Sequence, residues 1–138
     1  MLVRKKTVSQ EVTTMLSHVS IGVKDLAKTR SFYDAALKPL GYKCVAEGSG
    51  YVYYGVKSPE FGILAVKHPV PANAESGLHF CFEGPNRADV DAFHAAALKH
   101  GGKDNGKPGL RADYGENYYA AFVVDPEGYR LEAYTSAK

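Results

Sequence analysis

The stretch HVSIGVKDLAKTRSFYDAALKPLG at residues 18–41 returns in altered form as HFCFEGPNRADVDAFHAAALKHGG at residues 79–102. With a shift of 61, eight of the 24 positions are identical, including His18 with His79 and Phe32 with Phe93. Ordinary residue frequencies would give about one or two identities by chance. The chain is therefore a tandem duplication of one unit.

Each unit reads as a strand, a helix and three further strands. In the first strand, Val19, Ile21 and Val23 alternate with polar or small residues, which is the period of a half-buried strand. Asp25 and Asn86 are suitable helix N-caps. We expect helices at 26–37 and from Asn86 to about 100, and strands at 16–23, 42–46, 51–56, 62–67, 78–83, 118–124 and 129–135.

These elements predict an α+β fold made of two tandem βαβββ modules, at about 16–70 and 77–136. The sheets would form an open, barrel-like cleft, with the helices outside. Residues 103–113 are rich in Gly and Pro, and we expect a loop with a short strand there. Residues 1–14 have no clear period and are expected to be an N-terminal tail.

Composition excludes several classes of function. The chain has 138 residues, 45% of them hydrophobic and 23% charged, with a formal charge of +2, which suits one globular domain and no nucleic-acid partner. No apolar run is long enough to span a membrane. Two cysteines and no signal-peptide core favour a cytoplasmic location. Phosphate-loop, dinucleotide-binding and serine-hydrolase motifs do not occur in the sequence.

His18, His79 and Glu132 are the candidate metal ligands. Each histidine is on the first strand of its unit, opposite the apolar stripe, and Glu132 alternates with Leu131 and Ala133 on the last strand. If the polar faces of the two modules meet, all three side chains point into one cleft. A single histidine is more often structural, but two imidazoles and a carboxylate form the facial set that binds Fe(II), and that also suits Mn, Ni or Zn.

The ends of the modules indicate an open metal site. A shift of 67 aligns Pro59-Glu60 with Pro126-Glu127, and places Ala65 opposite Glu132. Because alanine cannot bind a metal, three protein ligands would leave up to three positions for water or substrate. Such a metal could polarise a carbonyl or hold an enediolate or catecholate by two oxygens, with Glu132 as the catalytic carboxylate.

Aromatic and basic residues are candidates for a substrate pocket. Tyr51, Tyr53, Tyr114 and Tyr118 could line it, although tyrosine is also common in ordinary strands. Arg111 could bind a substrate carboxylate, or could be an ordinary exposed arginine.

The chain resembles the vicinal oxygen chelate superfamily, which includes glyoxalase I, bleomycin-resistance proteins and extradiol dioxygenases. The resemblance rests on LSHVSI at 16–21, GLHF at 77–80 and, above all, DPEGYRLE at 125–132. It implies that the four ligand positions of glyoxalase I fall on His18, Ala65, His79 and Glu132, and the three of the dioxygenases on the two histidines and Glu132. Relatives often form dimers, some of which complete the site across subunits.

The sequence thus predicts a divalent-metal-dependent enzyme for a small substrate chelated through vicinal oxygens, either a lyase or isomerase or a ring-cleaving oxygenase. The alternative is a metal-free protein of the bleomycin-resistance type that sequesters a small ligand. Whether His18→Ala abolishes metal retention would separate the two, and a homodimer is compatible with both.

Overall fold

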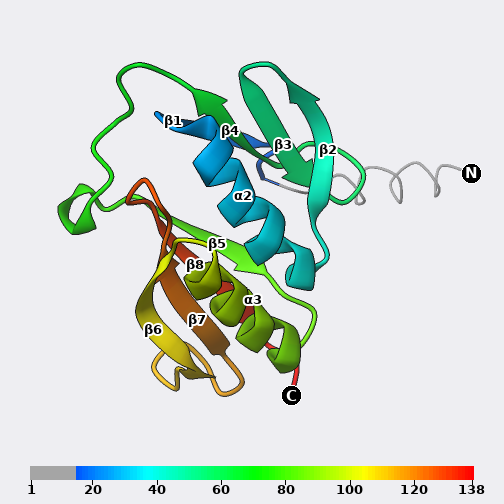
Figure 1. Ribbon diagram of the computed structural model, residues 1–138. Coiled ribbons are helices and arrows are strands. Elements are labelled where there is room, and N and C mark those ends of the chain that lie inside the picture. The colour runs from blue at the N-terminus through cyan, green and yellow to red at the C-terminus, as the bar shows by residue number, and fades with distance from the viewer. Residues whose placement is uncertain (1–14) are drawn as a thin grey trace, which may run out of the picture.

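The computed structural model describes residues 15–138 as two βαβββ modules (Figure 1), so the expected tail at 1–14 lies outside the described residues. The predicted α+β class and module order are confirmed. Module 1 comprises β1 (Val19–Val23), α2 (Leu26–Leu37), the short 3-10 helix η1 (Lys38–Leu40), β2 (Lys43–Gly48), β3 (Tyr51–Gly55) and β4 (Phe61–Ala65). Module 2 follows the 3-10 turn η2 (Ala74–Ser76) and comprises β5 (His79–Glu83), α3 (Arg87–Lys99), β6 (Lys103–Leu110), β7 (Tyr119–Val124) and β8 (Arg130–Thr135). Within residues 15–138 no helix is long and apolar enough to cross a membrane.

The two modules repeat one sheet topology. The strand orders are β1-β4-β3-β2 and β5-β8-β7-β6, so the first strand of each module pairs in parallel with the last and lies at an edge. Both helices begin at the predicted caps, where Asp25 Oδ1 accepts from Lys28 N and Asn86 Oδ1 accepts from Asp89 N. Each helix covers the apolar face of its own sheet, and α2 also packs against α3.

Aromatic contacts join the modules beside the helices. The Phe61 ring of module 1 makes edge contacts with Phe80 and Phe82 of β5, at centroid distances of 5.6 and 5.1 Å. The Tyr42 hydroxyl donates to the Glu83 carbonyl at 2.7 Å. These contacts form one core that continues from module to module.

The turn before β8 reaches into module 1. The buried Asp125 carboxylate accepts from the Tyr33 hydroxyl and from Tyr129 N. The two Glu127 oxygens accept from Lys24 N and Asp25 N at the start of α2, at 2.9 and 3.0 Å, where a negative charge suits the helix dipole. The conspicuous DPEGY motif therefore fastens one module to the other.

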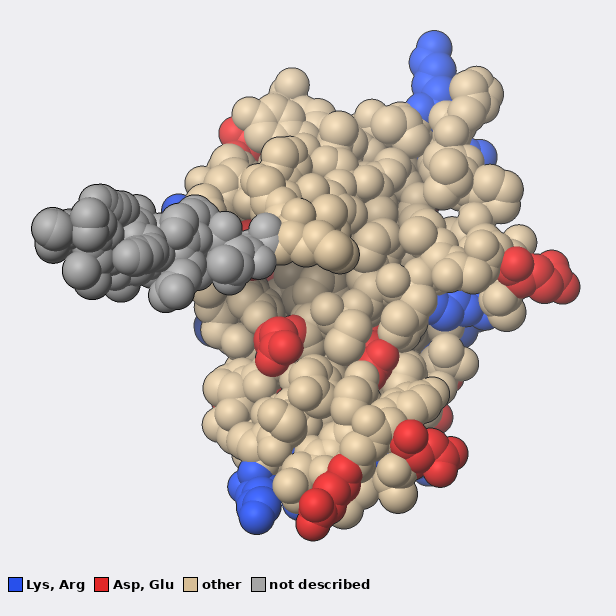
Figure 2. Space-filling model, turned by 180° about the vertical axis from the view of Figure 1, so that it is seen from behind, with Lys and Arg blue, Asp and Glu red and all other residues tan. Residues whose placement is uncertain are grey.

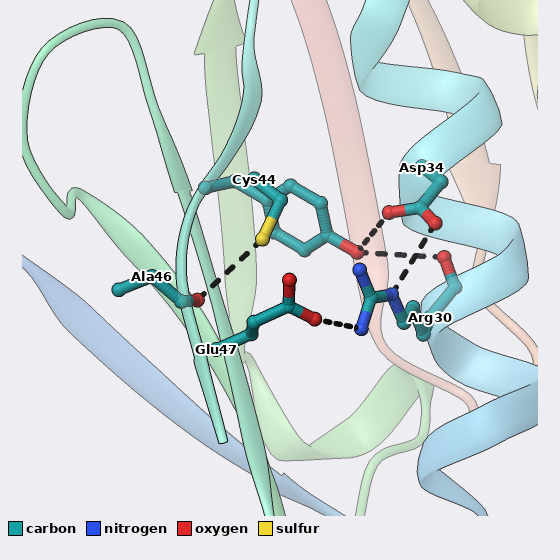
Figure 3. A network of polar contacts seen from close by, with 6 residues as sticks. Arg30, Asp34, Cys44, Ala46 and Glu47 are labelled. Atoms are coloured by element: carbon teal, nitrogen blue, oxygen red, sulfur yellow. Dashed lines mark hydrogen bonds and ion pairs between the residues drawn. The ribbon is translucent and has the colours of Figure 1, made fainter.

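A polar network fastens β2 to α2 at the far edge of module 1 (Figure 3). Arg30 Nη1 donates to Glu47 Oε1 at 2.6 Å, and Arg30 Nε lies 3.4 Å from Asp34 Oδ2. The Tyr54 hydroxyl donates to Asp34 Oδ1 at 2.8 Å. This network holds the edge strand without occupying the face that carries the candidate residues.

The expected loop at 103–113 is largely strand, because β6 runs from Lys103 to Leu110. Its pairing with β7 is interrupted at Gly106 and again before Gly109. Gly and Pro are tolerated here because β6 is the outermost strand of its sheet and needs a complete ladder on one side only.

Candidate functional site

A hydrogen-bonded cluster on module 2 contains two of the three predicted metal ligands. His79 Nε2 lies 2.7 Å from Glu132 Oε1, and the Tyr118 hydroxyl donates to Glu132 Oε2 at 2.6 Å. Glu132 pairs with Cys81 across the parallel β5–β8 ladder and with Phe122 across the antiparallel β7–β8 ladder. Because paired residues share a face, these side chains all project from the side of the sheet away from α3.

Solvent reaches the imidazole of this cluster but hardly reaches its carboxylate. The Glu132 side chain is 6% exposed, whereas that of His79 is 42% exposed. Burial, together with the hydrogen bond to Glu132, raises the pKa of Tyr118 above its ordinary value, so its hydroxyl stays a proton donor. Burial and the Glu132 charge raise the pKa of the Cys81 thiol to about 12.

The sequence did not single out Phe122, which organises the exposed side of the cluster. Its ring stacks on His79 at a centroid distance of 6.0 Å. The Arg111 guanidinium also lies over this ring, 5.4 Å from its centroid. Tyr114 packs edge-on against Tyr118 at 5.2 Å. Only the strand register, which places Phe122 opposite Glu132, could have identified it.

His18 lies in a separate hollow on module 1. It shares a hollow of about 450 Å³ with Tyr51 and Tyr53, bonds Ser17 Oγ through Nδ1 at 3.0 Å and packs edge-on against the Tyr53 ring. The predicted pocket residues therefore divide into two groups. Tyr51 and Tyr53 accompany His18, whereas Arg111, Tyr114 and Tyr118 accompany Glu132.

The cleft between the modules does not unite the two histidines, contrary to the expectation for a single chain. It measures about 390 Å³ and has a floor that includes Tyr54 and Phe61, with His79 and Cys81 but not His18 among its lining residues. The helices, rather than the polar sheet faces, pack together between the modules. Seen from the side away from the helices, the molecule is hollowed near its middle, with acidic side chains beside the hollow (Figure 2).

The strand register also corrects the position equivalent to Glu132. Cys81 pairs with Glu132, and its counterpart under the shift of 61 is Ser20, which pairs with Gly62. Gly62, and not Ala65, is therefore the counterpart of Glu132 in module 1. Neither residue can bind a metal, so the predicted number of three protein ligands is unchanged.

The donor set fits a divalent metal only in part. An imidazole nitrogen and a carboxylate oxygen, as in His79 and Glu132, suit Fe, Mn, Ni or Zn. Within residues 15–138, however, no group of three His, Cys, Asp or Glu side chains is arranged to hold an ion. One chain thus supplies two donors side by side and keeps the third, His18, elsewhere.

Known proteins share this architecture. A family model described as the glyoxalase/bleomycin resistance protein/dioxygenase superfamily matches residues 15–133. A glyoxalase/bleomycin resistance protein from Albidiferax ferrireducens T118 is 34% identical in sequence, with a TM-score of 0.76 over 88% of this chain and 99% of that one.

More distant structures share the fold alone. A glyoxalase-related enzyme from Fulvimarina pelagi is 15% identical (TM-score 0.69, covering 88% of each chain). The fosfomycin resistance protein FosX from Mesorhizobium loti is 17% identical, with a TM-score of 0.63 over 87% of this chain and 90% of that one. No curated protein matches the chain.

Proposed function

Because the chain belongs to the glyoxalase/bleomycin resistance protein/dioxygenase superfamily, we propose that it is a divalent-metal-dependent enzyme acting on a small substrate chelated through vicinal oxygens. The observation that carries the proposal is the pair His79–Glu132, with its half-exposed imidazole and a carboxylate fixed at both oxygens. The two free cysteines agree with a cytoplasmic location.

The third ligand in this proposal is His18 of a second copy of the chain. Within residues 15–138, β1 and β5 are the outer strands of their sheets, and each has one edge without a neighbouring strand. His79 is the first residue of β5, and His18 directly precedes β1. A two-fold dimer that places β1 of one copy beside β5 of the other would bring His18 toward His79 and Glu132. The same operation makes two such sites per dimer.

The bound metal would supply Lewis acidity toward the two substrate oxygens. The protein's own residues would orient and exchange protons. The Phe122 ring fixes the plane of the His79 imidazole, and the Tyr118 hydroxyl fixes Glu132 through Oε2. Glu132 Oε1 is then the atom that can accept a substrate proton, in a lyase or isomerase reaction or ahead of ring cleavage.

Elemental analysis of protein purified without chelators tests the proposal. We expect near-stoichiometric Fe, Mn, Ni or Zn in the wild type and its loss in both His79→Ala and His18→Ala, with the exposed loop variant His68→Ala as the matched control. No retained metal, even after reconstitution with each ion, would overturn the proposal.

Mixing the two inactive variants tests the shared site. If His18 comes from a second copy, each mixed dimer of His18→Ala and His79→Ala holds one intact site, so random mixing restores about a quarter of the metal sites. If all ligands come from one chain, mixing restores none.

A metal-free ligand-sequestering protein is the second candidate. Two observations favour it. His79 and Glu132 are hydrogen-bonded directly to each other, and the cleft between the modules has an aromatic floor. It predicts ligand binding without metal and unchanged by His18→Ala.

A further inference from the structure

We infer that the substrate carries an anionic group and that Arg111 binds this group, an inference that rests on the proposed function. It concerns the Phe122 ring beside the His79–Glu132 cluster: the His79 ring stacks on Phe122 at a centroid distance of 6.0 Å, and the Arg111 guanidinium lies 5.4 Å from the centroid of the same ring. The chemical class indicated is a small acid, such as an α-hydroxy acid, whose carboxylate supplies both one of the two vicinal oxygens and the negative charge for Arg111.

Arg111 is held in place by the site itself. Its backbone N donates to the Tyr118 carbonyl at 2.8 Å, and Tyr118 in turn holds Glu132. Its Nη2 donates to the Lys107 carbonyl at 2.7 Å, and its guanidinium lies over the Phe122 ring. Arg111 is therefore a preorganised group rather than a freely moving surface chain.

The Arg111 charge has no carboxylate partner within residues 15–138, whereas Arg30 has two, Asp34 and Glu47. Glu132, the acid of this cluster, is already bonded to His79 and Tyr118. A guanidinium stays charged at every physiological pH, and its remaining N–H groups match the geometry of a carboxylate. An anionic substrate group would complete this arrangement.

Arg87 is a matched control on the other side of the same sheet. Its guanidinium also lies over an aromatic ring, that of Tyr119, at 5.2 Å, and its Nε donates to the Ala137 carbonyl. The Tyr119 hydroxyl bonds Asp91 of α3, which places this pair on the helix side, away from His79. Arg87 therefore shares the local chemistry of Arg111 but not its position.

The test compares binding of mandelate with that of mandelamide, which keeps the vicinal oxygens and the ring but lacks the charge. Calorimetry on the wild type, with and without added Mn²⁺, should show at least about tenfold tighter binding of mandelate. Arg111→Gln should remove this preference, Arg111→Lys should keep part of it, and Arg87→Gln should leave it unchanged.

The outcomes separate the two proposals. Equal binding of both probes, no binding of either, or a preference that survives Arg111→Gln overturns the role of Arg111. A preference that depends on Arg111 in protein that retains no metal supports the anion site and overturns the metal-dependent function instead.

Discussion

Both modules place a histidine against an aromatic ring, edge-on in module 1 and stacked in module 2. In module 1 the His18 ring packs against Tyr53 at 5.9 Å, and in module 2 the His79 ring packs against Phe122 at 6.0 Å. Tyr53 and Phe122 are equivalent in register, since they pair with Gly62 and Glu132 respectively. The duplicated scaffold has therefore kept the support of the histidine in both halves.

The modules differ in the residue that faces the ring. Module 2 has Glu132, with both oxygens bonded, whereas module 1 has Gly62, and the Tyr53 ring covers the space where a side chain would stand. The Tyr53 hydroxyl bonds Ser20 Oγ at 2.7 Å instead of a carboxylate. The halves are thus complementary rather than redundant. A site that needs two imidazoles and a carboxylate must take His18 from a module 1 and both His79 and Glu132 from a module 2.

The turns before the last strands show the same asymmetry. In module 1, the backbone of Glu60 bonds within its own module: its N–H donates to the Tyr54 carbonyl, and its carbonyl accepts from Val19 N. In module 2 the equivalent turn crosses to module 1 through Asp125 and Glu127. Among the described residues, the turn before the last strand therefore crosses to the other module in module 2 but not in module 1.

The largest expected effect comes from breaking this fastening. Asp125→Ala removes a buried acceptor and leaves the fully buried Tyr33 hydroxyl without a partner, which should lower the free energy of unfolding by about 3 kcal/mol. Urea unfolding measures the change, with exposed Asp113→Ala as the control. A loss no greater than that of the control would show that the turn does not hold the modules together.

An intermediate effect is expected from filling the gap in module 1. A Cβ at Gly62 would overlap the Tyr53 ring, so Gly62→Ala should cost about 1–3 kcal/mol of unfolding free energy. The same substitution in a Tyr53→Ala background should cost much less, and Gly50→Ala, where the space is open, serves as the control. Equal costs with and without the ring would remove Tyr53 as the reason for glycine.

Much of this arrangement follows from the sequence, because the repeat and the alternation of Val19, Ile21 and Val23 specify the strand faces and the helix caps. The pairing of His79 with Glu132 follows from the same alternation. The shift of 67 aligns Ala65 with Glu132, whereas the strand register aligns Gly62 with it, because a sequence shift does not encode how one strand is staggered against its neighbour. The separation of His18 from His79 depends on how the modules pack, which local periodicity does not encode.

The smallest expected effect concerns Cys81, the counterpart of Ser20, which reports on the carboxylate that distinguishes the modules. Although the Cys81 residue is exposed, desolvation of its thiol and the Glu132 charge raise the thiol pKa to about 12, so the thiol is almost entirely protonated at pH 8. In a Cys44→Ser background, iodoacetamide should therefore modify Cys81 at least a hundredfold more slowly than a free cysteine, at a rate that increases with pH. Glu132→Gln should lower the thiol pKa and speed the reaction only severalfold, because burial, the larger cause, remains; Glu47→Gln, in module 1, should change nothing. Rapid modification of the parent protein at pH 8, or no response to Glu132→Gln, would mean that the sulfur does not sense the carboxylate.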